Sequence, residues 1–184
     1  MAGSSVSDSM TAQRRLWAPW RNAYLSRIGT GRCIFCVAKR SRADRRHHVV
    51  ARGRRVFAIL NRYPYNNGHL MIAPYRHVST LTSLRAAEWS ELLTMLQRLS
   101  QRVNRTLRPH GFNLGINLGR DAGAGIPGHL HVHLVPRWQG DTNFMPILAD
   151  TKVVSQSLDE LYTLFTLAPK ALVRGFTRPQ RRAP

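Results

Sequence analysis

Three histidines stand at alternate positions in the segment 128–135, whose sequence is GHLHVHLV. Because successive side chains of a β-strand point to opposite faces, His129, His131 and His133 would share one face, with apolar residues on the other. A buried imidazole needs its own hydrogen-bond partners, so three on one face indicate chemistry rather than packing. Two interpretations stay open from the residues alone. All three histidines chelate a metal ion, or one is a nucleophile supported by the other two.

A glycine-rich segment directly precedes these histidines. Residues 117–128 (NLGRDAGAGIPG) contain four glycines within twelve positions. Glycines let backbone N–H groups approach an anion closely, although an ordinary turn has a similar composition. Placed immediately before three histidines, the segment favours a phosphate-binding loop, and phosphoryl chemistry becomes the leading interpretation.

The chain has two cysteines, Cys33 and Cys36. Two intervening residues are the usual spacing for one half of a zinc site or for a redox pair. A single pair is not a disulfide framework, and thiols persist in a reducing compartment. The sequence therefore predicts a cytoplasmic protein.

The strands and the helix that must position these residues follow from the apolar pattern. Apolar runs at 56–60 and 69–73, separated by strong turn formers, predict an antiparallel strand pair. Between 83 and 107, apolar residues recur at steps of three and four, which predicts one long amphipathic helix. Pro109 and Gly111 then end this helix.

Three further elements complete the expected fold. They are two more strands at 112–118 and 129–135 and a short helix at 157–167. The basic segment 39–55 is expected to be a loop or an edge hairpin. The order of strands and helices predicts an α+β domain with a mainly antiparallel sheet rather than a doubly wound one.

A chain of 184 residues with 43% hydrophobic residues can bury a single core. We expect a mobile N-terminal tail over 1–15, a folded domain over 16–146, and a C-terminal extension over 147–184 packed on or near it. The sequence has no apolar run of about 18 residues, and its N-terminus is polar. We therefore expect neither a membrane-spanning nor a secreted protein.

The composition is strongly basic, with 28 Lys and Arg against 9 Asp and Glu and a formal net charge of +19. Such a charge attracts polyanions. However, 25 of the 28 are Arg, densest in the flanks, and an Arg-rich proteome would produce the same count. No helix-turn-helix, paired zinc-finger or RNA-recognition signature accompanies the charge. We therefore expect any nucleic-acid binding to be non-specific.

The segment 129–135 (HLHVHLV) resembles the signature of the histidine triad family of nucleotide hydrolases and transferases. Segments 57–64 (FAILNRYP) and 68–74 (GHLMIAP) resemble the nucleoside-binding hairpin of its fragile-histidine-triad branch. Segment 16–21 (LWAPWR), together with CIFC at 33–36, is similar to zinc-containing prokaryotic members such as diadenosine tetraphosphate phosphorylases. The resemblance covers about residues 16–146 and implies the histidine triad fold.

The resemblance implies roles for individual residues. His131 would be the nucleophile that attacks an α-phosphate and becomes a nucleotidyl-histidine. Its neighbour His133 would contact the phosphate from the same face. The other expected substrate contacts are Asn61 at the ribose, Asn117 near the phosphate, and the amides of Gly125 and Ile126 at the phosphate oxygens. Where many members have Ser or Thr before the triad, this chain has GIPG at 125–128.

The same resemblance implies a structural Zn²⁺ site, with Cys33 and Cys36 as thiolate ligands and His77 and His129 completing a tetrahedron. Bound there, the metal would brace the strand of the nucleophile without touching substrate. A redox cysteine pair is the alternative.

The function implied is nucleotidyl transfer at the α-phosphate of dinucleoside polyphosphates. Phosphorolysis of diadenosine tetraphosphate to ATP and ADP is favoured, by a homodimer that binds adenine nucleotides. One alternative is a hydrolase of dinucleoside polyphosphates or nucleoside phosphoramidates. Another is a zinc-braced nucleotide-binding module without turnover, which the net charge of +19 modestly supports.

Overall fold

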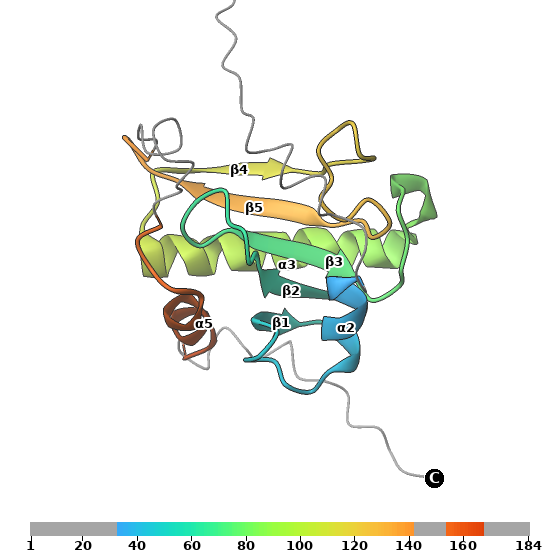
Figure 1. Ribbon diagram of the computed structural model, residues 1–184, viewed down its shortest axis with the longest axis horizontal. Coiled ribbons are helices and arrows are strands. Elements are labelled where there is room, and N and C mark those ends of the chain that lie inside the picture. Colours follow the sequence, from blue (N-terminus) through green and yellow to red (C-terminus); the bar gives the residue numbers. More distant parts are fainter. Residues whose placement is uncertain (1–32, 142–153, 168–184) are drawn as a thin grey trace, which may run out of the picture.

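The computed structural model describes residues 33–141 and 154–167 (Figure 1). The predicted tail at 1–15 and the LWAPWR segment at 16–21 lie outside the described residues. The division into a tail, a domain at 16–146 and an extension at 147–184 stays a prediction. No helix among the described residues combines the length and apolarity that crossing a membrane requires.

Five antiparallel strands form one sheet in the order β1-β2-β3-β5-β4. They are β1 (Val49–Arg52), β2 (Val56–Leu60), β3 (Leu70–Pro74), β4 (Gly111–Gly115) and β5 (Val132–Arg137). The predicted pair 56–60 and 69–73 is the β2–β3 hairpin, in register from Val56 opposite Pro74 to Leu60 opposite Leu70. Within the basic segment 39–55, β1 pairs with β2 as an edge strand, so the edge-hairpin alternative is correct.

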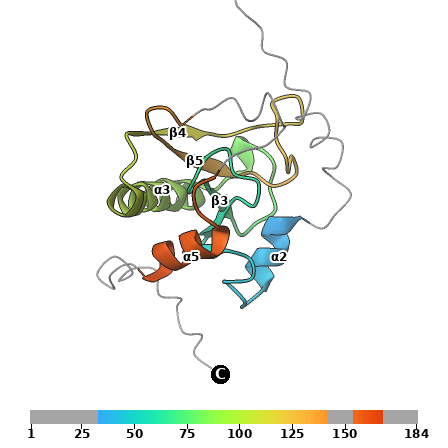
Figure 2. The same ribbon diagram turned by 60° about the vertical axis from the view of Figure 1, so that its left-hand side comes forward.

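One long helix, α3 (Ala86–Leu107), covers one face of the sheet, and α2 (Ile34–Arg40) lies on the other side (Figure 2). Helix α3 presents buried residues to the sheet at the predicted spacing, namely Leu92, Met95, Leu99 and Val103. It ends at Arg108, which has a left-handed backbone, immediately before Pro109. A 3₁₀ turn, Leu81–Ser83, precedes it.

The alternation of side chains along the central strands divides the core into two layers. On β2, Val56, Ala58 and Leu60 pack under α3, whereas Phe57 and Ile59 pack with Phe35 of α2 on the opposite face. The short helix α5 (Leu158–Leu167) adds the buried residues Leu161 and Phe165 to the α3 layer. The predicted α+β fold with an antiparallel sheet, one long helix and a short C-terminal helix is confirmed.

The start of β5 differs from the prediction. The strand begins at Val132, so His129 and His131 precede it and only His133 lies within it. Continuing the β3–β5 register would place Pro74 opposite Leu130, and proline has no N–H to donate to the ladder. The Leu130 N–H instead donates to the carbonyl oxygen of Val78, at 2.6 Å. The pairing therefore stops before it reaches the first two histidines.

Candidate active site and metal centre

The histidine cluster lies on the α2 face of the sheet. The ring of Phe35 in α2 is centred 4.9 Å from the ring of His129 and 5.0 Å from that of His131. His133 stands opposite Met71, a residue of the core layer under α2. All three histidines are buried, although only one belongs to a strand. The three histidines therefore lie on one face, as predicted, although His129 and His131 belong to the loop before β5 rather than to the strand.

His131 has one ring nitrogen committed to the backbone. Its Nδ1 lies 2.8 Å from the carbonyl oxygen of His129, which can only accept, so Nδ1 carries the hydrogen. Burial lowers the pKa of the His131 imidazole and favours its neutral form. A neutral ring protonated at Nδ1 has a free electron pair on Nε2. This is the protonation state that a nucleophilic imidazole requires.

A hydrogen bond between His69 and His133 holds His133 in the opposite tautomer to His131. The Nδ1 of His69 receives the backbone N–H of Tyr65 at 3.0 Å and the side-chain amide of Asn61 at 3.2 Å, so it accepts. The Nε2–H of His69 therefore donates to Nδ1 of His133, at 2.8 Å. This leaves the hydrogen of His133 on Nε2, which is buried without a hydrogen-bond partner in the described structure. Burial and the neighbouring His131 lower the pKa of His133 to about 4.

His69 is the functional residue that the sequence analysis missed. The signal was strand alternation, because His69 and Met71 share one face of the chain and Met71 stands opposite His133. This signal can be used only when β3 and β5 are known to be neighbours in the sheet. In the sequence, a long helix and β4 separate the two strands. The ring of Tyr65 covers the pair, with ring centroids 4.7 Å from His69 and 5.5 Å from His133.

The expected substrate-contact residues differ in how close they lie to this pair. The amide of Asn61 is buried, with Oδ1 accepting the Tyr63 N–H at 2.9 Å and Nδ2 directed at His69. Asn117 donates to the Gly123 carbonyl at 3.3 Å and so closes the glycine-rich loop. The Ile126 carbonyl accepts the N–H of His129, which ties the same loop to the triad. Substrate contacts by Asn61, Asn117, Gly125 and Ile126 stay predictions.

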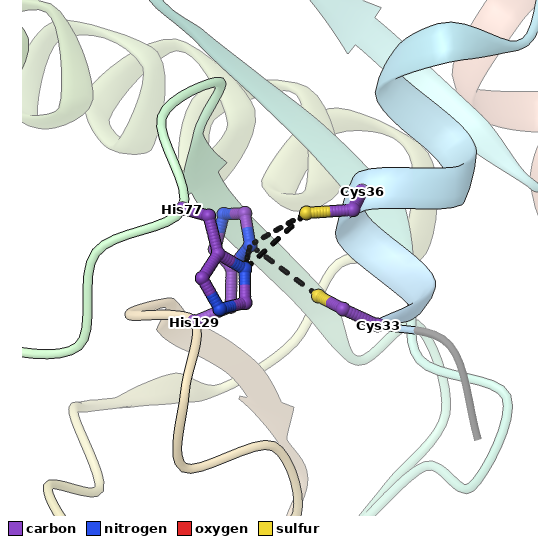
Figure 3. A group of neighbouring side chains, drawn as sticks. All are labelled: Cys33, Cys36, His77 and His129. Carbon is purple, nitrogen blue, oxygen red and sulfur yellow. Dashed lines mark hydrogen bonds between the residues drawn. The ribbon is translucent and has the colours of Figure 1, made fainter.

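The four predicted metal ligands meet at one point (Figure 3). Cys33 and Cys36 come from the start of α2, His77 from the turn after β3, and His129 from the residues before β5. Their ligand atoms all lie within 4.8 Å of one another. This is the only group of three or more potential metal ligands found among residues 33–141 and 154–167.

The spacing of these atoms fits a tetrahedral ion. Zinc bonds of about 2.3 Å to sulfur and 2.05 Å to nitrogen imply edges of about 3.6 Å between S and N and about 3.3 Å between two N. The Sγ atoms lie 3.4 Å (Cys33) and 3.7 Å (Cys36) from Nδ1 of His129, and the Nδ1 atoms of His77 and His129 are 3.2 Å apart. The Nε2–H of His129 donates to the Pro74 carbonyl at 2.9 Å, which leaves Nδ1 free to ligate.

An ion pair fixes the turn that carries His77. The guanidinium of Arg76 donates to both carboxylate oxygens of Glu88, at 2.7 and 2.6 Å, and Glu88 also accepts the Arg85 N–H at the start of α3. These bonds hold the pKa of the Glu88 carboxyl near 2. The long helix therefore anchors the backbone next to a metal ligand.

Comparison with known proteins agrees with this geometry. The HIT domain family model matches residues 42–140. An AP-4-A phosphorylase of Mycobacterium tuberculosis is 44% identical over 166 residues, covering 84% of this chain and 85% of that protein. A bis(5'-nucleosyl)-tetraphosphatase of Schizosaccharomyces pombe is 34% identical over 84 residues, 46% of each chain. A histidine triad nucleotide-binding protein of Sulfolobus tokodaii has a TM-score of 0.61 at 25% identity, covering 77% of this chain and 95% of that one.

An antiparallel α+β fold with a buried histidine triad before and within strand β5 defines the class of protein. The chain belongs to the HIT family. It is an enzyme of that family.

Removing one thiolate tests the metal centre. We expect the wild-type protein to retain about one metal ion per chain through dialysis and Cys33→Ser to lose most of it, because three ligands hold the ion less tightly than four. The variant should also unfold at a lower temperature. Elemental analysis and thermal unfolding are the measurements, with His47→Ala, outside the cluster, as the control. Full metal content in Cys33→Ser would exclude this ligand set.

Proposed function

We propose that the enzyme transfers a nucleotidyl group from the α-phosphate of a dinucleoside polyphosphate through a nucleotidyl-histidine at His131. One observation carries the proposal. Two neighbouring imidazoles, with ring centroids 4.8 Å apart, are held in opposite tautomers. The first has an electron pair on Nε2, and the second has an unpartnered N–H on Nε2. A nucleophile beside a hydrogen-bond donor is the arrangement that in-line displacement at phosphorus requires.

The chemistry proceeds in two displacements. In the first, Nε2 of His131 bonds to the α-phosphorus, and the bond from phosphorus to the leaving oxygen breaks. The Nε2–H of His133 donates a hydrogen bond to that oxygen and stabilises its developing negative charge, while His69 holds the ring in place. In the second, an acceptor oxygen bonds to phosphorus, and the electron pair of the P–N bond returns to Nε2 of His131.

The names of two relatives support the substrate class. The mycobacterial relative is an AP-4-A phosphorylase, and the yeast relative is a bis(5'-nucleosyl)-tetraphosphatase. We propose diadenosine tetraphosphate as substrate and inorganic phosphate as acceptor, giving ATP in the first displacement and ADP in the second. The higher identity and coverage of the phosphorylase favour phosphate over water. Hydrolysis of dinucleoside polyphosphates or nucleoside phosphoramidates is the alternative, and a binding module without turnover is a second.

We propose Zn²⁺ as the ion of the metal centre. Two thiolates and two imidazoles at tetrahedral spacing are a common set of ligands for structural zinc. Bound Zn²⁺ would supply a rigid cross-link between α2, the turn after β3 and the residues before β5. The role is structural, because all four positions are filled by protein ligands.

The proposed assembly is a homodimer. Strand β4 is an edge of the described sheet and presents Leu114, which is 56% exposed, while α3 presents Leu93, which is 47% exposed. An edge strand with exposed apolar side chains is a natural site for association of two copies. The cytoplasmic location and the non-specific character of any nucleic-acid binding stay predictions.

Replacing the nucleophile tests the mechanism. We expect His131→Asn to lower kcat by about 10³-fold or more, because no other side chain supplies the attacking electron pair. Nucleotide binding should persist, and His133→Ala should impair turnover less. Quenching the wild type with labelled substrate at alkaline pH, where the P–N bond survives, should trap a nucleotidyl group on His131, and His110→Asn, at an exposed position, is the control. Ordinary turnover in His131→Asn would contradict the mechanism, and a wild type that binds nucleotide without turnover would point to a binding module.

Product analysis tests the acceptor. With diadenosine tetraphosphate, we expect ATP and ADP when phosphate is supplied. Water is far more concentrated than phosphate, so this outcome requires that the enzyme bind phosphate and position it at the nucleotidyl-histidine. Chromatography of products across a phosphate titration is the measurement. AMP and ATP formed at a rate indifferent to phosphate would establish hydrolysis instead.

Sedimentation analysis tests the dimer. We expect two copies per particle for the wild type and a monomer for Leu93→Glu combined with Leu114→Glu, because burying two carboxylates in an apolar contact is unfavourable. Leu167→Glu is a control, since Leu167 is also exposed but lies on α5. A dimer that survives the double substitution would place the interface elsewhere.

A further inference from the structure

A basic groove lies on the α3 side of the sheet, away from the histidine cluster. It has a volume of about 440 Å³ and runs between the β1–β2 turn and the N-terminal half of α3. Its polar lining residues are Arg54, Arg55, Ser90, Glu91, Thr94 and Arg98. Three guanidinium groups against one carboxylate give the groove a net positive charge.

The carboxylate of Glu91 is used to hold the turn. Its Oε1 accepts the Arg54 N–H at 2.5 Å and the Arg55 N–H at 3.0 Å, and its Oε2 pairs with the Arg55 guanidinium at 3.6 Å. A side chain at Gly53 would meet this carboxylate, because an added Cβ would lie 2.2 Å from Oε1. The turn is therefore fixed directly on the helix. The Glu91 carboxylate thereby sets the backbone positions of both arginines.

Two donors in the groove are available to a ligand. The Arg54 guanidinium is exposed and has no partner among the described residues, and the same holds for the hydroxyl of Ser90. Arg98 adds a third positive charge one helical turn beyond Thr94. These features together favour an anion with several oxygen atoms.

The lining also indicates which anion. Among the described residues, no aromatic ring lines the groove, so these residues offer no surface on which a nucleobase could stack. Guanidinium groups and hydroxyls recognise phosphate oxygens regardless of the base. We propose that this groove binds a short phosphate chain, recognised through its oxygens and independently of any attached nucleoside, at a site separate from the histidine cluster.

Calorimetric titration with inorganic tripolyphosphate tests the proposal. We expect Arg54→Gln combined with Arg98→Gln to weaken one binding event by about tenfold or more, because the groove loses two of its three positive charges. Arg42→Gln combined with Arg105→Gln is the matched control, since it removes the same charge from exposed positions outside the groove. The control should bind as the wild type does, and Glu91→Gln should bind several-fold more tightly because it removes the repelling charge.

Three outcomes would overturn the proposal. Equal affinity in the groove variant and its control would show that the groove does not hold the anion. A preference for ATP over UTP that depends on Arg54 and Arg98 would show recognition of a base. Tighter Arg54-dependent binding of single-stranded DNA than of tripolyphosphate would assign the groove to nucleic acid. Turnover of dinucleotides is measured separately from tripolyphosphate binding. A result that contradicts the proposed role of His131 is therefore distinguishable from one that contradicts anion binding in the groove.

Discussion

His129 connects the candidate metal-binding cluster to His131, the proposed nucleophile, and the rest of the site depends on that connection. Its ring donates one N–H to the Pro74 carbonyl and turns its other nitrogen toward Cys33, Cys36 and His77. Its own carbonyl oxygen accepts the Nδ1–H of His131, two residues further along the chain. One residue therefore fixes a metal ligand through its side chain and a tautomer through its backbone. In the proposed mechanism, a metal ion in this cluster would brace His131 without touching the substrate.

Two chains of hydrogen bonds, rather than the histidines alone, distinguish the two active imidazoles. A carbonyl oxygen forces the hydrogen of His131 onto Nδ1, and a relay from Tyr65 and Asn61 through His69 forces that of His133 onto Nε2. The two rings are thereby held in opposite tautomers, which the proposed mechanism uses for attack by His131 and for hydrogen-bond donation by His133. Burial keeps both rings neutral, because it lowers the pKa of each.

The sheet separates two regions that differ in what they can bind. On the α2 face, the buried imidazoles of the triad lie beside the cluster of Cys33, Cys36 and His77. On the α3 face, Arg54, Arg55 and Arg98 give a groove its basic character, and none of its described lining residues is aromatic. Helix α3 serves both faces, since Glu88 near its start anchors the turn of His77 and Glu91, one turn later, anchors the arginine turn.

The sequence by itself determined the fold class, the long helix, the central hairpin and the four residues of the metal cluster. Apolar periodicity is a local property, and a family motif carries its ligands in fixed positions, so both can be read without coordinates. Where β5 begins was decided by tertiary structure, because Pro74 on a neighbouring strand cannot donate to Leu130. The role of His69 was decided in the same way. Only the adjacency of β3 and β5 brings it to His133, and no local pattern encodes which strands become neighbours across a helix of 22 residues.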